Sequence, residues 1–152
     1  MEFTTETVMS KNFAPVAPEE SMHHVYFKMK QSYIQYMPVI EKTGQLIGLI
    51  TNQELNRPIP SKAKVSDYMC TPVGQATCDT SICEIAKRIL EHKLAAVAIM
   101  EKNQVVGVVA ASDLLKVLVP LLDYNSNEIS AAQKIPMAKP ASFISNLFHA
   151  ST

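Results

Sequence analysis

Two acidic residues occupy the same place in two similar stretches of the chain. Asp113 follows the run Val105–Ala110 (V-V-G-V-V-A), and Glu54 follows the run Leu46–Thr51 (L-I-G-L-I-T). Each run is typical of a β-strand, and helix-forming residues follow it. Where a strand ends at the start of a helix, free backbone N–H groups lie beside the carboxylate. Both positions are therefore candidate ligand contacts.

The two stretches are copies of one pattern. Three pairs of residues are each 59 positions apart (107 − 48, 110 − 51 and 113 − 54): Gly48 and Gly107, Thr51 and Ala110, Glu54 and Asp113. An earlier apolar stripe with the i, i+3, i+4, i+7 spacing of a helix recurs after 60 positions (82 − 22), as Met22, Val25, Tyr26, Met29 and then Ile82, Ile85, Ala86, Ile89. The chain is therefore a tandem repeat, and its second copy lacks one residue before the glycine.

Each copy is predicted to contain an extended segment, a helix, a β-hairpin and a closing helix. In the first copy these are Phe13–Pro18, a helix capped by Ser21, strands Tyr36–Glu41 and Gln45–Thr51 around a Gly44 turn, and a helix over Asn52–Arg57. In the second they are Thr71–Thr77, a helix with a Ser81–Glu84 capping box, strands Ala95–Met100 and Gln104–Ala110, and a helix over Ser112–Leu122 with Ser112 as N-cap.

These elements divide the chain into four parts. We expect a first unit at 1–57, a proline-containing linker at 58–64, a second unit at 65–122 and a C-terminal tail at 123–152. Within the tail, Ser142–Phe148 has four large apolar residues and can form a short amphipathic helix. We expect this helix to dock on this chain, a second subunit or another protein; the alternative is a disordered segment.

The composition excludes several classes of function. Fourteen basic and fourteen acidic residues leave no net charge to attract DNA, RNA or an anionic membrane. No apolar run reaches the ~20 residues of a membrane span, and the N-terminus lacks the apolar core of a signal peptide. Three cysteines without metal-site or disulfide spacing indicate a reducing, cytoplasmic location. We find no catalytic motif, metal site or cofactor motif, so we expect no enzyme.

The order of elements resembles a pair of CBS domains, the Bateman module. The resemblance rests on the openings Val8-Met9 and Tyr68-Met69, the motif Met37-Pro38-Val39-Ile40 and the two glycine-to-acid stretches, and it covers Thr7–Leu122. It implies an α/β fold in which two tandem β-α-β-β-α units pack pseudo-symmetrically, here with a C-terminal extension. Two such pairs commonly form a homodimer.

The resemblance also implies binding of an adenosine-containing ligand, such as AMP, ADP, ATP or S-adenosylmethionine, in the clefts between units. Asp113 matches the family's ribose-binding acid, but Ala110 stands where a hydroxyl residue is usual, with Ser112 as a substitute. Thr51 keeps the hydroxyl, but Glu54 replaces the aspartate. We therefore favour the cleft with Asp113 and interpret Glu54 as a solvated helix residue.

The resemblance places further residues at the cleft wall: Pro38 and Val39 from the family's proline-containing strand, and Thr77 from the second unit's extended segment. The second unit has no such proline, and Ala96 or Val97 takes the position of Pro38. Each site thus matches the family in part.

Two functions follow from this interpretation. The first is a regulatory module that binds an adenine nucleotide or S-adenosylmethionine and signals to an effector protein that the sequence does not identify. The alternative is a ligand-free dimerisation or interaction module with degenerate clefts, which Ala110 and Glu54 favour.

Overall fold

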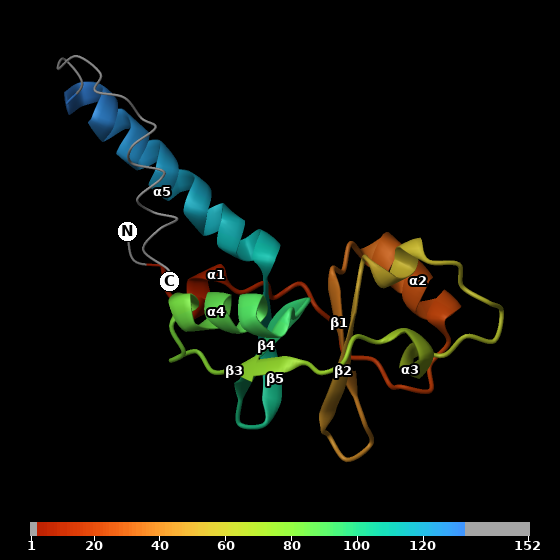
Figure 1. The fold of residues 1–152 in the computed structure, drawn as a ribbon. Helices are drawn as coiled ribbons and strands as arrows, with labels where there is room; N and C mark the ends of the chain where they lie inside the picture. The colour runs from red at the N-terminus through yellow and green to blue at the C-terminus, as the bar shows by residue number, and fades with distance from the viewer. Residues whose placement is uncertain (1–2, 133–152) are drawn as a thin grey trace. The chain divides into compact units, whose positions relative to one another are not determined.

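Two β-hairpins, one from each repeat, form the sheets. Strand β1 (Tyr36–Ile40) pairs antiparallel with β2 (Leu46–Thr51), and β4 (Ala96–Glu101) pairs antiparallel with β5 (Gln104–Ala110). Strand β3 (Gly74–Ala76) lies parallel to β4 and makes the second sheet three-stranded. The structure, a computed structural model, describes residues 3–132, and a division between Val117 and Leu118 separates two compact units. Both hairpins belong to the first unit (Figure 1).

One long helix in each repeat covers its sheet. Helix α2 (Met22–Ser32) buries the predicted apolar stripe in a core cluster with β1 and β2, and α4 (Ile82–His92) does the same in the second repeat. Both helices end in a left-handed residue, Tyr33 at φ 54° and Lys93 at φ 50°. The predicted mixed α/β fold with two repeated units is thus confirmed.

The caps of these two helices differ from the prediction in detail. The Ser81 hydroxyl accepts a hydrogen bond from the Glu84 N–H at 3.1 Å, as predicted. The Glu84 carboxylate instead accepts one from the Arg88 guanidinium, so the reciprocal half of the capping box is not made. Ser21 is the N-cap residue of α2, as predicted, but its side chain makes no capping hydrogen bond, and its backbone bridges Lys64.

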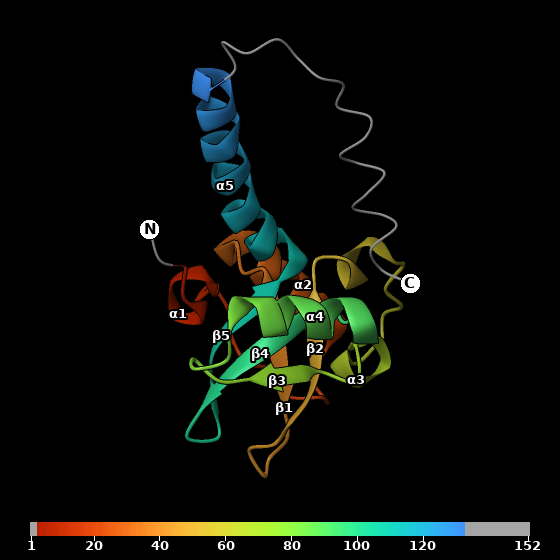
Figure 2. The ribbon, with the colours of Figure 1, turned by 60° about the vertical axis from the view of Figure 1, so that its left-hand side comes forward.

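The short opening helices are exchanged between the repeats. Helix α1 (Thr5–Val8), from the first repeat, packs against β5, while α3 (Val65–Tyr68), from the second, packs against β2. Figures 1 and 2 show α1 among the elements of the second repeat. Each opening segment then forms a backbone bridge with the other repeat's sheet, Ser10 with Val108 and Cys70 with Leu49. Each repeat therefore completes the other's core.

The repeated glycines make this exchange possible. An added Cβ on Gly48 would lie 2.9 Å from the Cβ of Met69, and one on Gly107 would lie 3.0 Å from the Cβ of Met9. A side chain at either position would collide with the methionine packed on the strand. The glycines are thus required by the close approach of the opposite repeat's opening segment.

The hairpins also fix which residues are equivalent. Pro38 pairs with Leu49, and Ala98 pairs with Val108, the counterpart of Leu49 after 59 positions (108 − 49). The position of Pro38 is therefore taken by Ala98, and the prediction of Ala96 or Val97 is wrong. The sequence shows that the second repeat is one residue shorter, but not where that residue is missing. An error of one position in the alignment assigns a side chain to the wrong face of the strand, because side chains alternate faces with a period of two.

Both closing helices differ in length from the prediction. The first is only a 3₁₀ turn, η1 (Glu54–Asn56), since Pro58 prevents a longer helix. The second, α5 (Ala111–Ala132), starts one residue early and continues ten residues past Leu122, because no glycine or proline follows Pro120 within it. The predicted docking segment, Ser142–Phe148, lies outside the described residues.

Candidate functional site

Glu54 is buried and hydrogen-bonds to Thr51, the last residue of β2. Its side chain is 7% exposed, and its Oε2 accepts hydrogen bonds from the Thr51 N–H at 2.7 Å and the Thr51 hydroxyl at 2.6 Å. Its Oε1 accepts a third from the Cys70 thiol, with an Sγ–Oε1 distance of 2.9 Å. The interpretation of Glu54 as a solvated residue is therefore wrong. A buried carboxylate must be hydrogen-bonded, and these three donors satisfy it.

The partner thiol is held in its neutral form. Burial, and next the hydrogen bond to Glu54, raise the pKa of Cys70 to about 12. An adjacent carboxylate disfavours a thiolate because the two negative charges would repel each other. Cys70 is thus a hydrogen-bond donor at neutral pH and not a nucleophile.

Asp113 occupies the equivalent position in the second repeat, at the corner where β5 ends and α5 begins. It is 2% exposed, and its Oδ2 accepts a hydrogen bond from the Ala110 N–H at 2.9 Å. Its Oδ1 pairs with the Lys116 ammonium at 3.2 Å, and that lysine side chain is 72% exposed. Each acid therefore reaches back three residues to the N–H of the strand-terminal residue.

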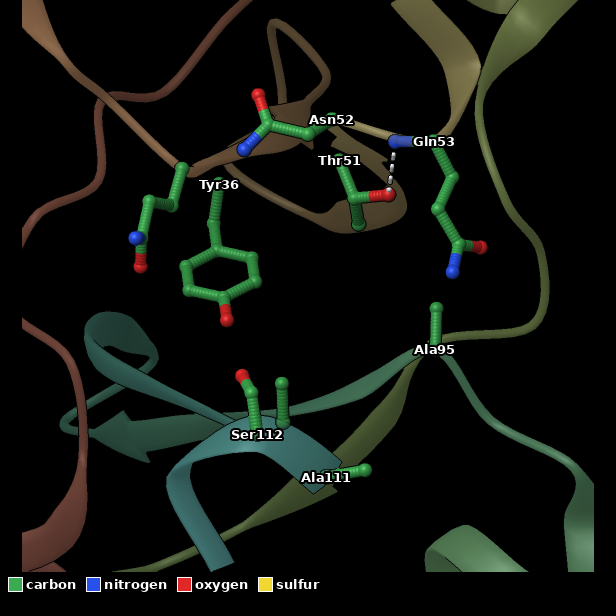
Figure 3. Close-up of a pocket in the computed structure, with 9 residues that line it drawn as sticks. Tyr36, Thr51, Asn52, Gln53, Ala95, Ala111 and Ser112 are labelled. Atoms are coloured by element: carbon green, nitrogen blue, oxygen red, sulfur yellow. Dashed lines mark hydrogen bonds between the residues drawn. The ribbon is translucent and has the colours of Figure 1, made fainter. Parts of the chain in front are cut away.

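Ser112 lies in the first turn of α5 and is not its N-cap, because the helix already begins at Ala111. The predicted cap is therefore wrong. The Asp113 carboxylate accepts a hydrogen bond from the N–H of Ala110, the last residue of β5. This leaves the Ser112 hydroxyl directed toward the space between the repeats, where it faces the Tyr36 hydroxyl (Figure 3).

A central cleft of about 280 Å³ lies where the two repeats meet. Its floor is made of small side chains and its rim of hydroxyl and amide groups, from both repeats. The lining residues are Gln35, Tyr36, Thr51, Asn52, Gln53, Ala95, Ala110, Ala111 and Ser112. None of these side chains carries a charge at neutral pH, and burial raises the pKa of Tyr36 above its ordinary value. The cleft therefore suits a flat, uncharged group with hydrogen-bonding edges.

An outer cleft of about 700 Å³ shares Gln53, Ala95 and Ala111 with the central one. Three basic side chains line it: Arg57, His92 and Lys93. The Arg57 guanidinium stacks 4.7 Å from the centroid of the Tyr68 ring and donates to the Tyr68 carbonyl at 3.3 Å. This surface can attract an anionic group next to the neutral cleft.

The structure brings only some of the predicted site residues together. Thr51, Ala110 and Ser112 line the central cleft, and Glu54 lines the outer one. The others line neither cleft: Asp113, Pro38, Val39 and Thr77. Pro38 and Val39 are buried in β1, and the Thr77 N–H donates to the Thr80 hydroxyl at 3.1 Å.

Sequence reasoning missed several lining residues. Tyr36 was recognisable in principle, because the first residue of a hairpin's first strand pairs with the last residue of its second strand, here Thr51. His92 and Lys93 carry no motif, and they reach the outer cleft only because α4 ends beside it. Within residues 3–132, no cluster of metal-ligating side chains forms.

The model of the CBS domain matches the chain twice, at residues 6–60 and 65–120. The chain therefore belongs to the CBS domain family and carries a tandem pair.

The curated relatives are mostly larger proteins. Homoserine O-acetyltransferase of Methanococcoides burtonii is 25% identical over 113 residues, which cover 73% of this chain and 23% of that protein. The chain spans less than a quarter of the first three curated relatives. The similarity thus concerns their CBS portion.

Solved structures show the same fold. A CBS domain pair in complex with 5′-methylthioadenosine and S-adenosyl-L-methionine has a TM-score of 0.65 at 19% identity, covering 78% of this chain and 97% of that one. The cytosolic domain of the Mg²⁺ channel MgtE, in complex with ATP, has a TM-score of 0.61 at 20% identity, covering 75% and 48%. Of the helices that the structure describes, none has the length and apolar content needed to cross a bilayer.

Proposed function

We propose that this CBS pair is a regulatory module that binds an adenosine-containing ligand between its repeats and signals to an effector protein. The candidate ligands are AMP, ADP, ATP and S-adenosylmethionine. In this proposal the chain acts in the cytoplasm as a homodimer and catalyses no reaction. The ligand acts by binding one arrangement of the protein more tightly than another.

The central cleft is the observation that carries the proposal. Thr51 and Ala110 end equivalent strands and line the cleft from opposite repeats. The alanine floor leaves room for a purine, and the hydroxyls of Thr51 and Ser112 are suitable partners for its polar edges or for a ribose. A ligand held by both repeats would sense their relative arrangement.

The outer cleft supports a ligand with phosphate groups. It begins at Ala95 and Ala111, on the floor of the central cleft. A nucleoside in the central cleft could extend its phosphates toward Arg57 and Lys93. The buried Glu54 carboxylate faces the same space, but its oxygens already accept three hydrogen bonds. We assign Asp113 and Glu54 the role of holding the strand ends, with the Asp113 carboxylate as a further ribose contact if Lys116 moves.

A ligand-free interaction module is the second candidate. The observation in its favour is that both acids already accept hydrogen bonds from within the protein, Glu54 from three donors and Asp113 from two. Ala110 adds no hydroxyl to the second corner.

Thermal shift assays with AMP, ADP, ATP, S-adenosylmethionine and GTP test the proposal. A ligand at about 100 times its Kd stabilises the folded state by about 2.7 kcal/mol, which raises the melting temperature measurably. We expect a response to one or more adenosine ligands and a weaker one to GTP. No response to any of them would favour the interaction module.

A blocked variant locates the site. Ala95→Leu places three extra carbons on the floor shared by both clefts, so we expect it to abolish the ligand response. Ala95 is exposed, so the unliganded protein should keep its stability. Gln31→Leu, an exposed leucine on α2 that lines neither cleft, is the matched control. A response that survives in Ala95→Leu would move the site elsewhere.

A further inference from the structure

The second half of α5 presents an apolar face to solvent. Leu118, Leu121 and Leu122 have the i, i+3, i+4 spacing of one helix face, and they are 45%, 45% and 54% exposed. Val119 beside them is 56% exposed. Soluble proteins seldom leave so many neighbouring large apolar side chains in water, which indicates that something covers this face.

The chain itself supplies a segment of matching apolar pattern. Residues 133–152 follow the helix, and Phe143, Ile144, Leu147 and Phe148 among them have the spacing i, i+1, i+4, i+5. A helix of this spacing carries all four on one side. The segment is too short to be stable by itself, so it requires a surface to bind.

The charges of the two segments are complementary. Residues 118–132 contain Asp123 and Glu128 and no lysine or arginine, whereas residues 133–152 contain Lys134 and Lys139 and no acidic residue. Two copies of α5 placed side by side in parallel would bring these like charges together. This favours the basic tail over a parallel second copy of the helix as the occupant.

The connection is also long enough. The distance along α5 from Ala132 back to Leu118 is about 21 Å at ~1.5 Å per residue. The ten residues 133–142 span up to ~33 Å when extended.

We propose that residues 143–148 fold back and bind the Leu118–Leu122 face of the same chain. The tail then shields α5 from unwanted association, and a partner protein with a stronger apolar surface could displace it. This proposal is independent of whether the clefts bind a nucleotide.

Disulfide trapping in the full chain tests it. The background variant replaces the native cysteines by Cys70→Ser, Cys78→Ala and Cys83→Ser. Asn125→Cys is combined with Ser151→Cys, because residue 125 lies seven positions after Leu118 and residue 151 lies four positions after Leu147, each on the apolar side of its segment. Asn127→Cys with Ser151→Cys is the matched control, since residue 127 lies on the opposite face of α5. Both asparagines are exposed.

We expect the intramolecular disulfide of the Asn125 pair to form at least about ten times faster than that of the Asn127 pair, at a rate that does not change on dilution. Adding Leu118→Ser and Leu122→Ser should bring the Asn125 rate down to the control's. Equal rates in the two pairs would overturn the proposal. A disulfide-linked dimer whose yield rises with protein concentration would also overturn it and would make a second copy the occupant.

Discussion

The strand-end corners of the two repeats share a geometry but differ in how fully their acids are hydrogen-bonded. Glu54 binds the N–H and the hydroxyl of Thr51 as well as the Cys70 thiol, all inside the protein. Asp113 binds the Ala110 N–H and a lysine that is mostly in solvent. One corner is closed by neutral internal donors and the other by a backbone N–H and an exposed surface cation.

This difference separates two roles of the same sequence position. An acid three residues after a strand end first serves as a cap for the strand's last N–H, and it does so in both repeats. The Oε1 of the longer Glu54 side chain binds Cys70, whereas the Oδ1 of Asp113 binds Lys116. In the proposed function, Asp113 exchanges this lysine for a ligand hydroxyl.

The largest expected effect comes from removing Glu54. Glu54→Ala leaves the N–H and hydroxyl of Thr51 and the Cys70 thiol without their acceptor inside the protein, at a cost of about 3 kcal/mol in unfolding free energy. Urea denaturation measures this loss. Glu91→Ala, at an exposed glutamate on α4, is the control and should change stability by less than about 0.5 kcal/mol.

Removing Asp113 should cost less. Asp113→Ala leaves one backbone N–H unpaired and frees a lysine that water solvates at once, so we expect a loss of about 1.5 kcal/mol. The same denaturation assay compares the two variants. Equal losses at both corners would show that the internal donors of Glu54 contribute nothing beyond the strand cap.

The secondary structure was predictable because the same pattern of apolar and turn residues occurs in both repeats. The β-hairpins and the two long helices followed from apolar spacing and turn residues, and the tandem CBS fold followed from the resemblance to that family; the structure and the family match confirm them. The 59-residue shift also paired Glu54 with Asp113 correctly, since both reach back to the N–H of a strand-terminal residue.

Burial and partners were not predictable from the same patterns. Glu54 looks like a solvent-facing residue because its neighbours are polar, and only the approach of Cys70 from the other repeat encloses it. The outer cleft gathers Arg57 and Lys93, which are 36 positions apart (93 − 57), through tertiary packing alone. Helix α5 is longer than predicted because no glycine or proline follows Pro120 within it. Local helix propensity did not predict this length.

The smallest and most local effect concerns Cys70. Its pKa of about 12, against an ordinary 9.0, means that the folded state keeps the thiol's proton more tightly than the unfolded state does. The stabilisation from this thiol is complete below pH 9 and is lost as the pH rises toward 12. Wild type should therefore lose more stability than Cys70→Ser between pH 9 and pH 12, in denaturation curves measured across that range.

Alkylation with iodoacetamide at pH 8.5 examines the same contact. The exposed Cys83 should react first and Cys70 last, as followed by mass spectrometry. Glu54→Gln removes the negative charge and should speed the reaction of Cys70 with little change at Cys83. A Cys70 that reacts as fast as Cys83 in wild type would contradict the hydrogen bond to Glu54.

The exchanged opening segments set the order in which the chain can fold. Met69 reaches Gly48 from 21 residues away (69 − 48), whereas Met9 must find Gly107 across 98 residues (107 − 9). During synthesis the first core can close as soon as Met69 leaves the ribosome, but the second must wait for β5. Neither half holds all of its own core, so a chain cut between residues 58 and 64 should yield fragments that fold only when mixed.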